Sequence, residues 1–283
     1  MPLAYGIVES VDVALPSFPQ TLDGFRIAHV SDLHTDRRTK RLDRMIYQLA
    51  KIKLDLGVLT GDYMIKHRGL GRAMPYLREL VTQVRPALGW YGVFGNHDWA
   101  EFTDQAADLP VRWLRDEAVT IQGKPIDLLG LHMDAVGGKP DPVAAALSVG
   151  MALDRTDAGE VILNTHQGKR FRLALTHKPD HLTACSDLGA DLVLAGHTHG
   201  GQVRLPFGPP LHNSSDLPLT MSSGLLRHRD TLCLITRGVG STPLAQSPIK
   251  FRIFCPPHVP VYTLRQGSMP GEYTDDIRKV WGW

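Results

Sequence analysis

Aspartate, asparagine and histidine side chains gather in five short motifs along the chain. In chain order the motifs read Asp-x-His, Gly-Asp, Gly-Asn-His-Asp, a single His, and Gly-His-x-His. The side chains able to bind metal are Asp32, His34, Asp62, Asn96, His177, His197 and His199. Carboxylate and imidazole groups suit divalent cations such as Mn²⁺, Fe²⁺ and Zn²⁺. Because these candidates exceed what one four-coordinate ion uses, they predict two neighbouring ions that share one bridging carboxylate.

The two tetrapeptide motifs are the most specific part of this pattern. Asp-x-His and Gly-Asp recur by chance in any chain of this length. Residues 95–98 and 196–199 form strings that each occur only about once per thousand such chains. Both are present, in order, and each follows a short apolar run. Together they indicate one metal-dependent site rather than scattered structural histidines.

All five motifs follow an apolar run with the length of a buried strand. The runs are residues 26–30, 56–59, 91–94, 172–175 and 192–195. Between the first three runs, residues 42–52 and 74–84 show the apolar spacing of helices, with Pro75 in a first turn and Pro86 as a stop. This order predicts a largely parallel sheet whose motifs meet at the carboxyl ends of the strands, where open α/β sheets bind ligands.

The remaining segments have weaker patterns. Residues 110–119 predict a helix, residues 120–133 predict a hairpin around Gly123-Lys124, and residues 232–236, 250–254 and 259–264 predict strands. We expect a single domain over residues 1–265, because motifs that share one site cannot belong to independent domains. Residues 266–283 are expected to form a loosely attached tail.

Composition narrows the function classes. The 31 Lys+Arg and 29 Asp+Glu residues leave a formal charge of +2, and 43% of residues are hydrophobic. These values are typical of soluble globular proteins and argue against disorder and against a nucleic-acid partner. The apolar runs are far shorter than the ~20 residues of a membrane helix, so a cytoplasmic location is expected. The basic run from Arg37 to Arg44 leaves peripheral membrane contact open.

The five motifs resemble those of the calcineurin-like metallophosphoesterases, and all five are intact between Asp32 and His199. The longer strings Thr-His-Lys-Pro-Asp at residues 176–180 and Gly-His-Thr-His-Gly-Gly-Gln-Val-Arg-Leu-Pro at residues 196–206 are similar to a bacterial branch of that family. The branch includes membrane-associated phosphodiesterases and a UDP-2,3-diacylglucosamine pyrophosphatase. The resemblance implies an α/β fold: a four-layer α/β/β/α sandwich of two mixed β-sheets flanked by helices.

The resemblance also implies a role for each site residue. One metal ion would be held by Asp32, His34 and His199 and the second by Asn96, His177 and His197, with Asp62 bridging them. His97 would stay off the metals and face the substrate, while Asp98 would orient the His97 ring and support its charge. Mn²⁺ is the expected ion, with Fe²⁺, Zn²⁺ and Mg²⁺ as alternatives.

Two such ions lower the pKa of a shared water molecule from about 15.7 toward about 7, which supplies hydroxide for attack on phosphorus. The expected function is hydrolysis of a phosphodiester or pyrophosphate bond in a small substrate, lipid-linked or nucleotide-linked, such as UDP-2,3-diacylglucosamine. His97 would hold the phosphate or donate a proton to the leaving group. One alternative is a broad or cyclic-nucleotide phosphodiesterase. Another is a non-catalytic protein-binding scaffold, although such proteins tend to lose ligands that are all present here.

Overall fold

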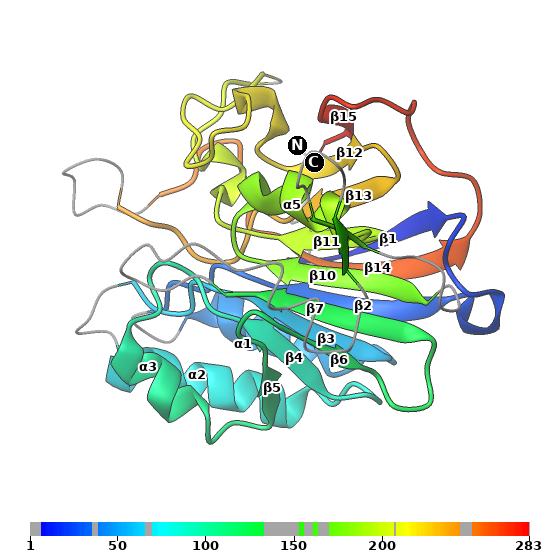
Figure 1. The fold of residues 1–283 in the computed structure, drawn as a ribbon. Coiled ribbons are helices and arrows are strands. Elements are labelled where there is room, and N and C mark those ends of the chain that lie inside the picture. Colours follow the sequence, from blue (N-terminus) through cyan, green and yellow to red (C-terminus); the bar gives the residue numbers. More distant parts are fainter. Residues whose placement is uncertain are drawn as a thin grey trace.

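Two mixed β-sheets lie face to face with helices on their outer faces, which confirms the expected four-layer α/β/β/α sandwich (Figure 1). The computed structural model describes residues 7–35, 39–65, 70–132, 153–155, 161–163, 170–206, 208–243 and 251–282. Among these residues no helix is long and apolar enough to cross a lipid bilayer.

The first sheet contains six strands, and its centre is parallel. Its order is β1 (Val8–Leu15), β14 (Val259–Gln266), β2 (Phe25–Val30), β3 (Leu56–Thr60), β4 (Trp90–Val93) and β5 (Val111–Trp113). Strands β2 to β5 are parallel, while β14 is antiparallel to β2 and parallel to β1. The carboxyl ends of β2, β3 and β4 therefore share one edge of the sheet.

The second sheet contains seven strands. Its order is β15 (Arg278–Trp281), β12 (Gly224–His228), β13 (Thr231–Ile235), β11 (Leu192–Ala195), β10 (Phe171–Thr176), β7 (Ile126–Leu131) and β6 (Glu117–Thr120). The four strands β13, β11, β10 and β7 are parallel, and the others are antiparallel to their neighbours. A separate hairpin pairs β8 (Leu153–Arg155) with β9 (Val161–Leu163).

Helices cover both outer faces. The first sheet is covered by α1 (Lys40–Leu49), α2 (Leu70–Gln83) and α3 (Ala100–Ala106), and the second by α5 (Leu182–Asp187) (Figure 1). Thr39 caps α1, because its side chain accepts the backbone N–H of Leu42. Short 3₁₀ turns are η1 (Gln20–Leu22), η3 (Pro179–His181), η4 (His199–Gly201) and η5 (Leu219–Met221).

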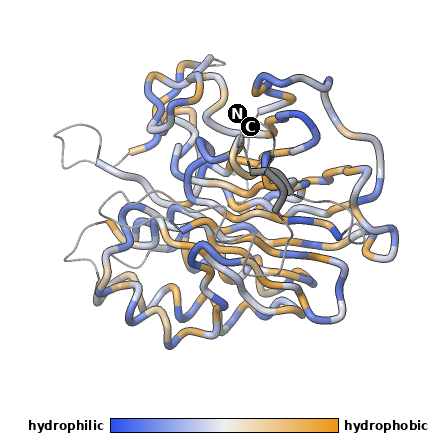
Figure 2. Tube along the Cα trace, in the orientation of Figure 1, coloured by the Kyte–Doolittle hydropathy of each residue, from blue (hydrophilic) through white to orange (hydrophobic). Residues whose placement is uncertain are grey.

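Three buried apolar clusters explain the four layers. Leu49 and Leu77 belong to the cluster between the helices and the first sheet, and Leu56 and Leu173 to the cluster between the sheets. A third cluster includes Leu182 of α5 and packs on the outer face of the second sheet. Figure 2 shows much of the hydrophobic colour on the central strands between these layers. Burying each such side chain contributes about 1.5–3 kcal/mol.

Two sequence-based expectations in the first half of the chain are corrected. The helix expected over residues 110–119 is wrong: these residues contribute to β5 and β6, because β5 pairs in parallel with β4. Pro75 lies inside α2 rather than in its first turn, since the helix begins at Leu70. The hairpin expected around Gly123 is confirmed by the antiparallel pairing of β6 with β7, and Met133 lies outside the described residues.

Two expectations near the C-terminus are also corrected. Of residues 250–254, only Ile253 makes a β-contact, an isolated bridge to Val203, and residue 250 lies outside the described part. The tail is not wholly loose, because Trp281 pairs with Leu225 and places β15 at the edge of the second sheet. The segment has only a weak apolar pattern, and it is held in place by its backbone pairing with β12.

Candidate metal centre

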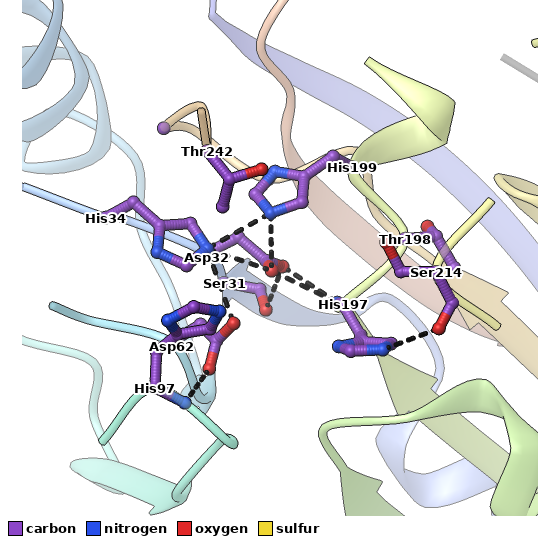
Figure 3. A network of polar contacts seen from close by, with 12 residues as sticks. Ser31, Asp32, His34, Asp62, His97, His197, Thr198, His199, Ser214 and Thr242 are labelled. Atoms are coloured by element: carbon purple, nitrogen blue, oxygen red, sulfur yellow. Dashed lines mark hydrogen bonds and ion pairs between the residues drawn. The ribbon is translucent and has the colours of Figure 1, made fainter. Parts of the chain in front are cut away.

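The predicted ligands follow five strand ends, and Figure 3 shows Asp32, His34, Asp62, His197 and His199 lying close together. In chain order, β2 leads to Asp32 and His34, β3 to Asp62, β4 to Asn96, β10 to His177, and β11 to His197 and His199. The first three strands are neighbours in one sheet, and the last two are neighbours in the other. The site therefore lies where the carboxyl ends of both parallel regions meet.

Six of these side chains form two compact groups. Asp32, His34 and His199 make one group and Asp62, His177 and His197 the other, and within each group the candidate ligand atoms lie within 4.8 Å of one another. None of the six residues is more than 8% exposed. Burial of this many ionisable groups is costly unless they are paired or bind a cation.

Asp62 faces both groups with a single oxygen. Its Oδ2 atom lies 3.3 Å from Nε2 of His34 and 3.2 Å from Nε2 of His177. Its Oδ1 atom accepts the backbone N–H of His97 at 2.9 Å, which fixes the carboxylate plane. This arrangement is that of a bridging ligand between two cation sites.

Backbone carbonyl groups orient three of the imidazole rings. Nδ1 of His34 donates to Met64 O at 3.0 Å, and Nδ1 of His177 donates to Thr60 O at 2.7 Å. Nε2 of His197 donates to Ser214 O at 2.9 Å (Figure 3). Because each carbonyl oxygen accepts the proton of one ring nitrogen, the other nitrogen of each ring is turned toward the neighbouring candidate ligands and can bind a metal ion once it has lost its proton.

Asn96 supplies a separate sign that a cation fits here. Its Oδ1 atom is buried and has no hydrogen-bond partner among the described residues. Buried polar atoms are nearly always hydrogen-bonded, so an orphaned amide oxygen needs an explanation. A divalent cation provides one, since amide oxygen, carboxylate and imidazole together form a donor set that such ions accept.

The backbone at the site is strained. Nine residues other than glycine have positive φ in the described part of the chain, and five of them are candidate ligands: Asp32, His34, Asp62, His197 and His199. Such conformations are uncommon for residues with a side chain and cluster at functional sites. Gly196 is required for close packing, because a Cβ atom there would lie 2.3 Å from Oδ2 of Asp32.

Burial and neighbouring charges set the protonation of the ligands. Burial, aided by the charge of His177, lowers the pKa of His197 to about 3, so its imidazole is neutral at pH 7. Burial would raise the pKa of Asp62, but the charges and hydrogen bonds of His177 and His34 hold it well below its usual range. The Asp62 carboxylate in turn overcomes the effect of burial on His177 and raises the pKa of that ring to about 9. Asp62 is thus ionised, as a cation-binding bridge must be.

The sequence matches the family model of the calcineurin-like phosphoesterases over residues 25–201. The chain belongs to the calcineurin-like phosphoesterase family. Members of this family are metal-dependent phosphoric ester hydrolases, and the two ligand groups above fit that chemistry. The matched residues include every motif that supplies a candidate ligand.

Relatives of this phosphoesterase match it over most of their length. The metallophosphoesterase YkoQ of Bacillus subtilis (strain 168) is 27% identical over 217 residues, 76% of each chain. Phosphodiesterase YaeI of Escherichia coli (strain K12) is 25% identical and covers 83% of each chain. UDP-2,3-diacylglucosamine pyrophosphatase LpxG of Chlamydia muridarum (strain MoPn / Nigg) is 23% identical, over 88% of this chain and 86% of its own.

In this phosphoesterase Asp98 binds backbone rather than the His97 ring, which corrects the expected contact. The Asp98 carboxylate accepts the backbone N–H groups of Asp62, Tyr63 and Gly95, each at 2.8 Å. The His97 ring instead donates from Nδ1 to Ile65 O at 3.1 Å. Asp98 is 1% exposed, and buried amide groups need an acceptor, which its carboxylate supplies at this turn. Asp98 therefore holds the turn that carries Asp62 in place.

Three supporting residues were missed by the sequence analysis. Ser31 Oγ donates to Oδ2 of Asp32 at 2.7 Å, and Ser214 anchors His197 through its carbonyl oxygen. Arg252 contacts His199 from a segment far along the chain. The position of Ser31 directly before a ligand was a signal that could have been noticed. No motif marks Ser214 or Arg252.

Proposed function

We propose that this phosphoesterase hydrolyses a phosphodiester or pyrophosphate bond in a lipid-linked or nucleotide-linked substrate, with UDP-2,3-diacylglucosamine as the leading candidate. The proposal depends on one observation: Oδ2 of Asp62 lies 3.3 Å from His34 and 3.2 Å from His177. A carboxylate in this position serves two cations at once. Paired cations suit an in-line displacement at phosphorus, because they stabilise both the attacking and the leaving oxygen.

The ligand sets are assigned as follows: Asp32, His34 and His199 to one divalent ion, Asn96, His177 and His197 to the other, and Asp62 to both. Mn²⁺ suits this mixture of nitrogen and oxygen donors. When bound, the ions would neutralise phosphate oxygens and lower the pKa of a water molecule toward neutrality. The chain itself holds the donor atoms at fixed positions through carbonyl groups and strained turns, so that no reorganisation is needed when the substrate binds.

His97 is assigned to the substrate. Its ring lies 5.1 Å from the ring of His34, centroid to centroid, at 86°. Its Nδ1 atom is bound to Ile65 O, so Nε2 is the nitrogen left for the substrate. His97 is half-buried, unlike the fully buried ligands. As an imidazolium it can stabilise charge on the phosphate or donate a proton to the leaving oxygen.

Two relatives support the substrate classes. The likeness to LpxG extends over 88% of this chain, which supports a pyrophosphate in a lipid-linked nucleotide. The likeness to the phosphodiesterase YaeI supports a second candidate, a phosphodiesterase of broader specificity. Both candidates use the same ligands and the same His97, and they differ in what binds beyond the phosphate.

The test compares a diester, a monoester and the lipid. Protein stripped with EDTA and reloaded with Mn²⁺ is assayed on bis-p-nitrophenyl phosphate, p-nitrophenyl phosphate and UDP-2,3-diacylglucosamine. We expect Mn²⁺-dependent hydrolysis of the diester and release of UMP from the lipid. Diester hydrolysis without UMP release would exclude UDP-2,3-diacylglucosamine as the substrate and favour the second candidate, the phosphodiesterase of broader specificity. Protein that binds no Mn²⁺ and hydrolyses none of the three would contradict both candidates and favour the scaffold.

A matched pair of variants connects the activity to the bridge. Asp62→Asn removes the shared charge but keeps the size of the side chain, and we expect it to abolish Mn²⁺-dependent activity. Asp12→Asn changes an exposed aspartate on β1 and serves as the control. Equal activity in both variants would argue against the assigned role of Asp62.

A further inference from the structure

A group of large apolar side chains is exposed beside the metal centre. We call it the apolar rim and define it as Leu205, Leu211, Phe251, Ile253 and Phe254. Phe254 is 65% exposed and Leu211 is 61% exposed. Single exposed apolar residues are common, but a contiguous group of them marks a contact surface.

Backbone hydrogen bonds hold the two segments of the rim side by side. Arg204 N–H donates to Ile253 O at 3.0 Å, and Ile253 N–H donates to Gln202 O at 3.0 Å. Leu211 N–H donates to Val203 O at 2.9 Å, which folds the first segment back onto itself. The rim is therefore one surface, although its segments lie about forty residues apart in sequence.

The same segments contact a metal-ligand residue from their inner side. Arg252 Nη1 donates to His199 O at 3.1 Å, and Cys255 Sγ donates to the same oxygen at 3.2 Å. Cys255 is buried and Arg252 is half-buried, while their neighbours Ile253 and Phe254 are exposed. The rim therefore lies directly outside the turn that carries His199.

Phe254 is held outward at a conformational cost. Its φ is 48°, a value that aromatic residues rarely adopt. A strained backbone that exposes a phenyl ring does not improve packing of the folded chain. Strain of this kind is typical of positions whose side chain serves a contact.

The charges around the rim are positive. In the described residues of 199–211 and 251–257 there is no carboxylate, and the charged side chains are the half-buried Arg204 and Arg252, of which Arg252 is turned inward to His199. A cavity of about 400 Å³ separates Phe251 from Arg41 at the start of α1, and no carboxylate lines it. Lys40, next to Arg41, is also exposed. Apolar side chains flanked by cations match the surface of an anionic bilayer, where headgroups are negative and acyl chains lie beneath them.

We propose that the apolar rim docks this phosphoesterase on an anionic lipid bilayer, with Lys40 and Arg41 facing the headgroups. This inference rests on the proposed lipid-linked substrate and says how that substrate reaches the site. The rim enters the headgroup region, and the neighbouring metal centre then lies close to a phosphate that remains in the membrane. Water-soluble esters need no such docking.

The test measures binding to vesicles. Sedimentation with phosphatidylcholine vesicles containing about 30% phosphatidylglycerol compares the wild type with the double variant Leu211→Gln/Phe254→Asn. Asparagine is chosen at 254 because it tolerates positive φ. We expect the wild type to bind and the double variant to bind at least ~10-fold more weakly, since two large apolar side chains no longer leave water. Tyr273→Asn, which changes another exposed aromatic residue, is the control.

A second pair of variants tests the charges. Arg41→Gln should weaken binding about 5-fold, and the effect should disappear with pure phosphatidylcholine. Arg85→Gln, at an exposed arginine after α2, should leave binding unchanged. Equal thermal unfolding of all variants shows that the fold is intact.

Three outcomes overturn the proposal. Wild-type protein that stays in solution with anionic vesicles is one, and a double variant that binds as well as Tyr273→Asn is another. The third is a wild type that light scattering shows to be a dimer and a Phe254→Asn variant that is a monomer. That result would mean that the rim binds a second copy of this chain rather than a bilayer. Hydrolysis of bis-p-nitrophenyl phosphate is measured on the same samples. Activity without vesicle binding overturns docking alone, and vesicle binding without activity overturns the proposed function alone.

Discussion

The guanidinium of Arg252 lies 3.2 Å from Nδ1 of His199, opposite the Nε2 atom that faces His34 at 3.1 Å. The same guanidinium donates to the carbonyl oxygens of His199 and Arg237. It therefore joins the turn after β11 to the turn after β13 and fixes the ring of His199, a candidate ligand, on the side away from His34. Burial lowers the pKa of Arg252 to about 10, so the group remains charged at neutral pH.

Arg252→Lys tests whether this contact positions the ligand. Lysine keeps the charge but lacks the planar fork that reaches several acceptors at once. We expect Mn²⁺ affinity to fall about 10-fold, the usual size of an effect on a residue that orients a metal ligand. Calorimetric titration with Mn²⁺ measures it, with Arg265→Lys at an exposed position on β14 as the control. Unchanged affinity in Arg252→Lys would show that the contact is only structural.

Asp62→Ala should reduce the metal content of the protein. Oδ2 of Asp62 lies 3.3 Å from His34 Nε2 and 3.2 Å from His177 Nε2. Without it, two cations would repel each other with no carboxylate between them, so we expect a loss of about one ion per chain. Elemental analysis of Mn²⁺-loaded protein measures the loss. Retention of the wild-type metal content would contradict the bridging assignment.

His97→Ala should separate catalysis from metal binding. The ring is anchored by Ile65 O and its Nε2 atom is free for the substrate. We expect unchanged metal content and a decrease in kcat of about 10²–10⁴-fold, the range for a lost general acid. His212→Ala, at an exposed histidine, controls for the loss of an imidazole. A kcat near the wild-type value would remove His97 from the mechanism.

The clustering of the candidate ligands was predictable because of a rule about sheets. Parallel strands end at the same edge, so motifs that directly follow apolar runs must meet there. This argument placed Asp32, Asp62 and His177 in one cluster although more than a hundred residues separate the first from the last. The helical spacing before β3 predicted α1 for a similar reason, since one apolar face has to cover the sheet.

The remaining features depend on contacts that no local pattern encodes. Asp98 accepts hydrogen bonds from three backbone amides. The motif at residues 95–98 predicts that this aspartate matters, but it does not predict which groups the carboxylate binds. Arg252 reaches His199 only because an irregular segment folds over the site. Residues 110–119 contribute to β5, which pairs with β4, and to β6, which pairs with β7, and these pairings override the propensity of a short segment.

Acid should destabilise the fold through His29, a buried histidine in β2. Its Nε2 atom lies 2.8 Å from Oγ1 of Thr60, and burial, with the charge of His258, lowers its pKa from 6.5 to about 3. Between these values the unfolded chain binds a proton that the folded chain does not. The free energy of unfolding therefore falls as the pH falls below 6.5, by up to about 1.4 kcal/mol per pH unit from this residue.

His29→Gln removes this contribution while keeping a polar side chain near Thr60. Urea unfolding of EDTA-treated protein is measured over about two pH units below 6.5, with His212→Gln as the control for an exposed histidine. We expect the wild type and the control to lose about 2–3 kcal/mol more stability over this range than His29→Gln does. The variant is less stable at neutral pH if Thr60 loses its partner, but that cost is the same at each pH and does not affect the slope. Parallel slopes for all three proteins would mean that His29 takes up its proton in the folded state, and that acid sensitivity arises elsewhere.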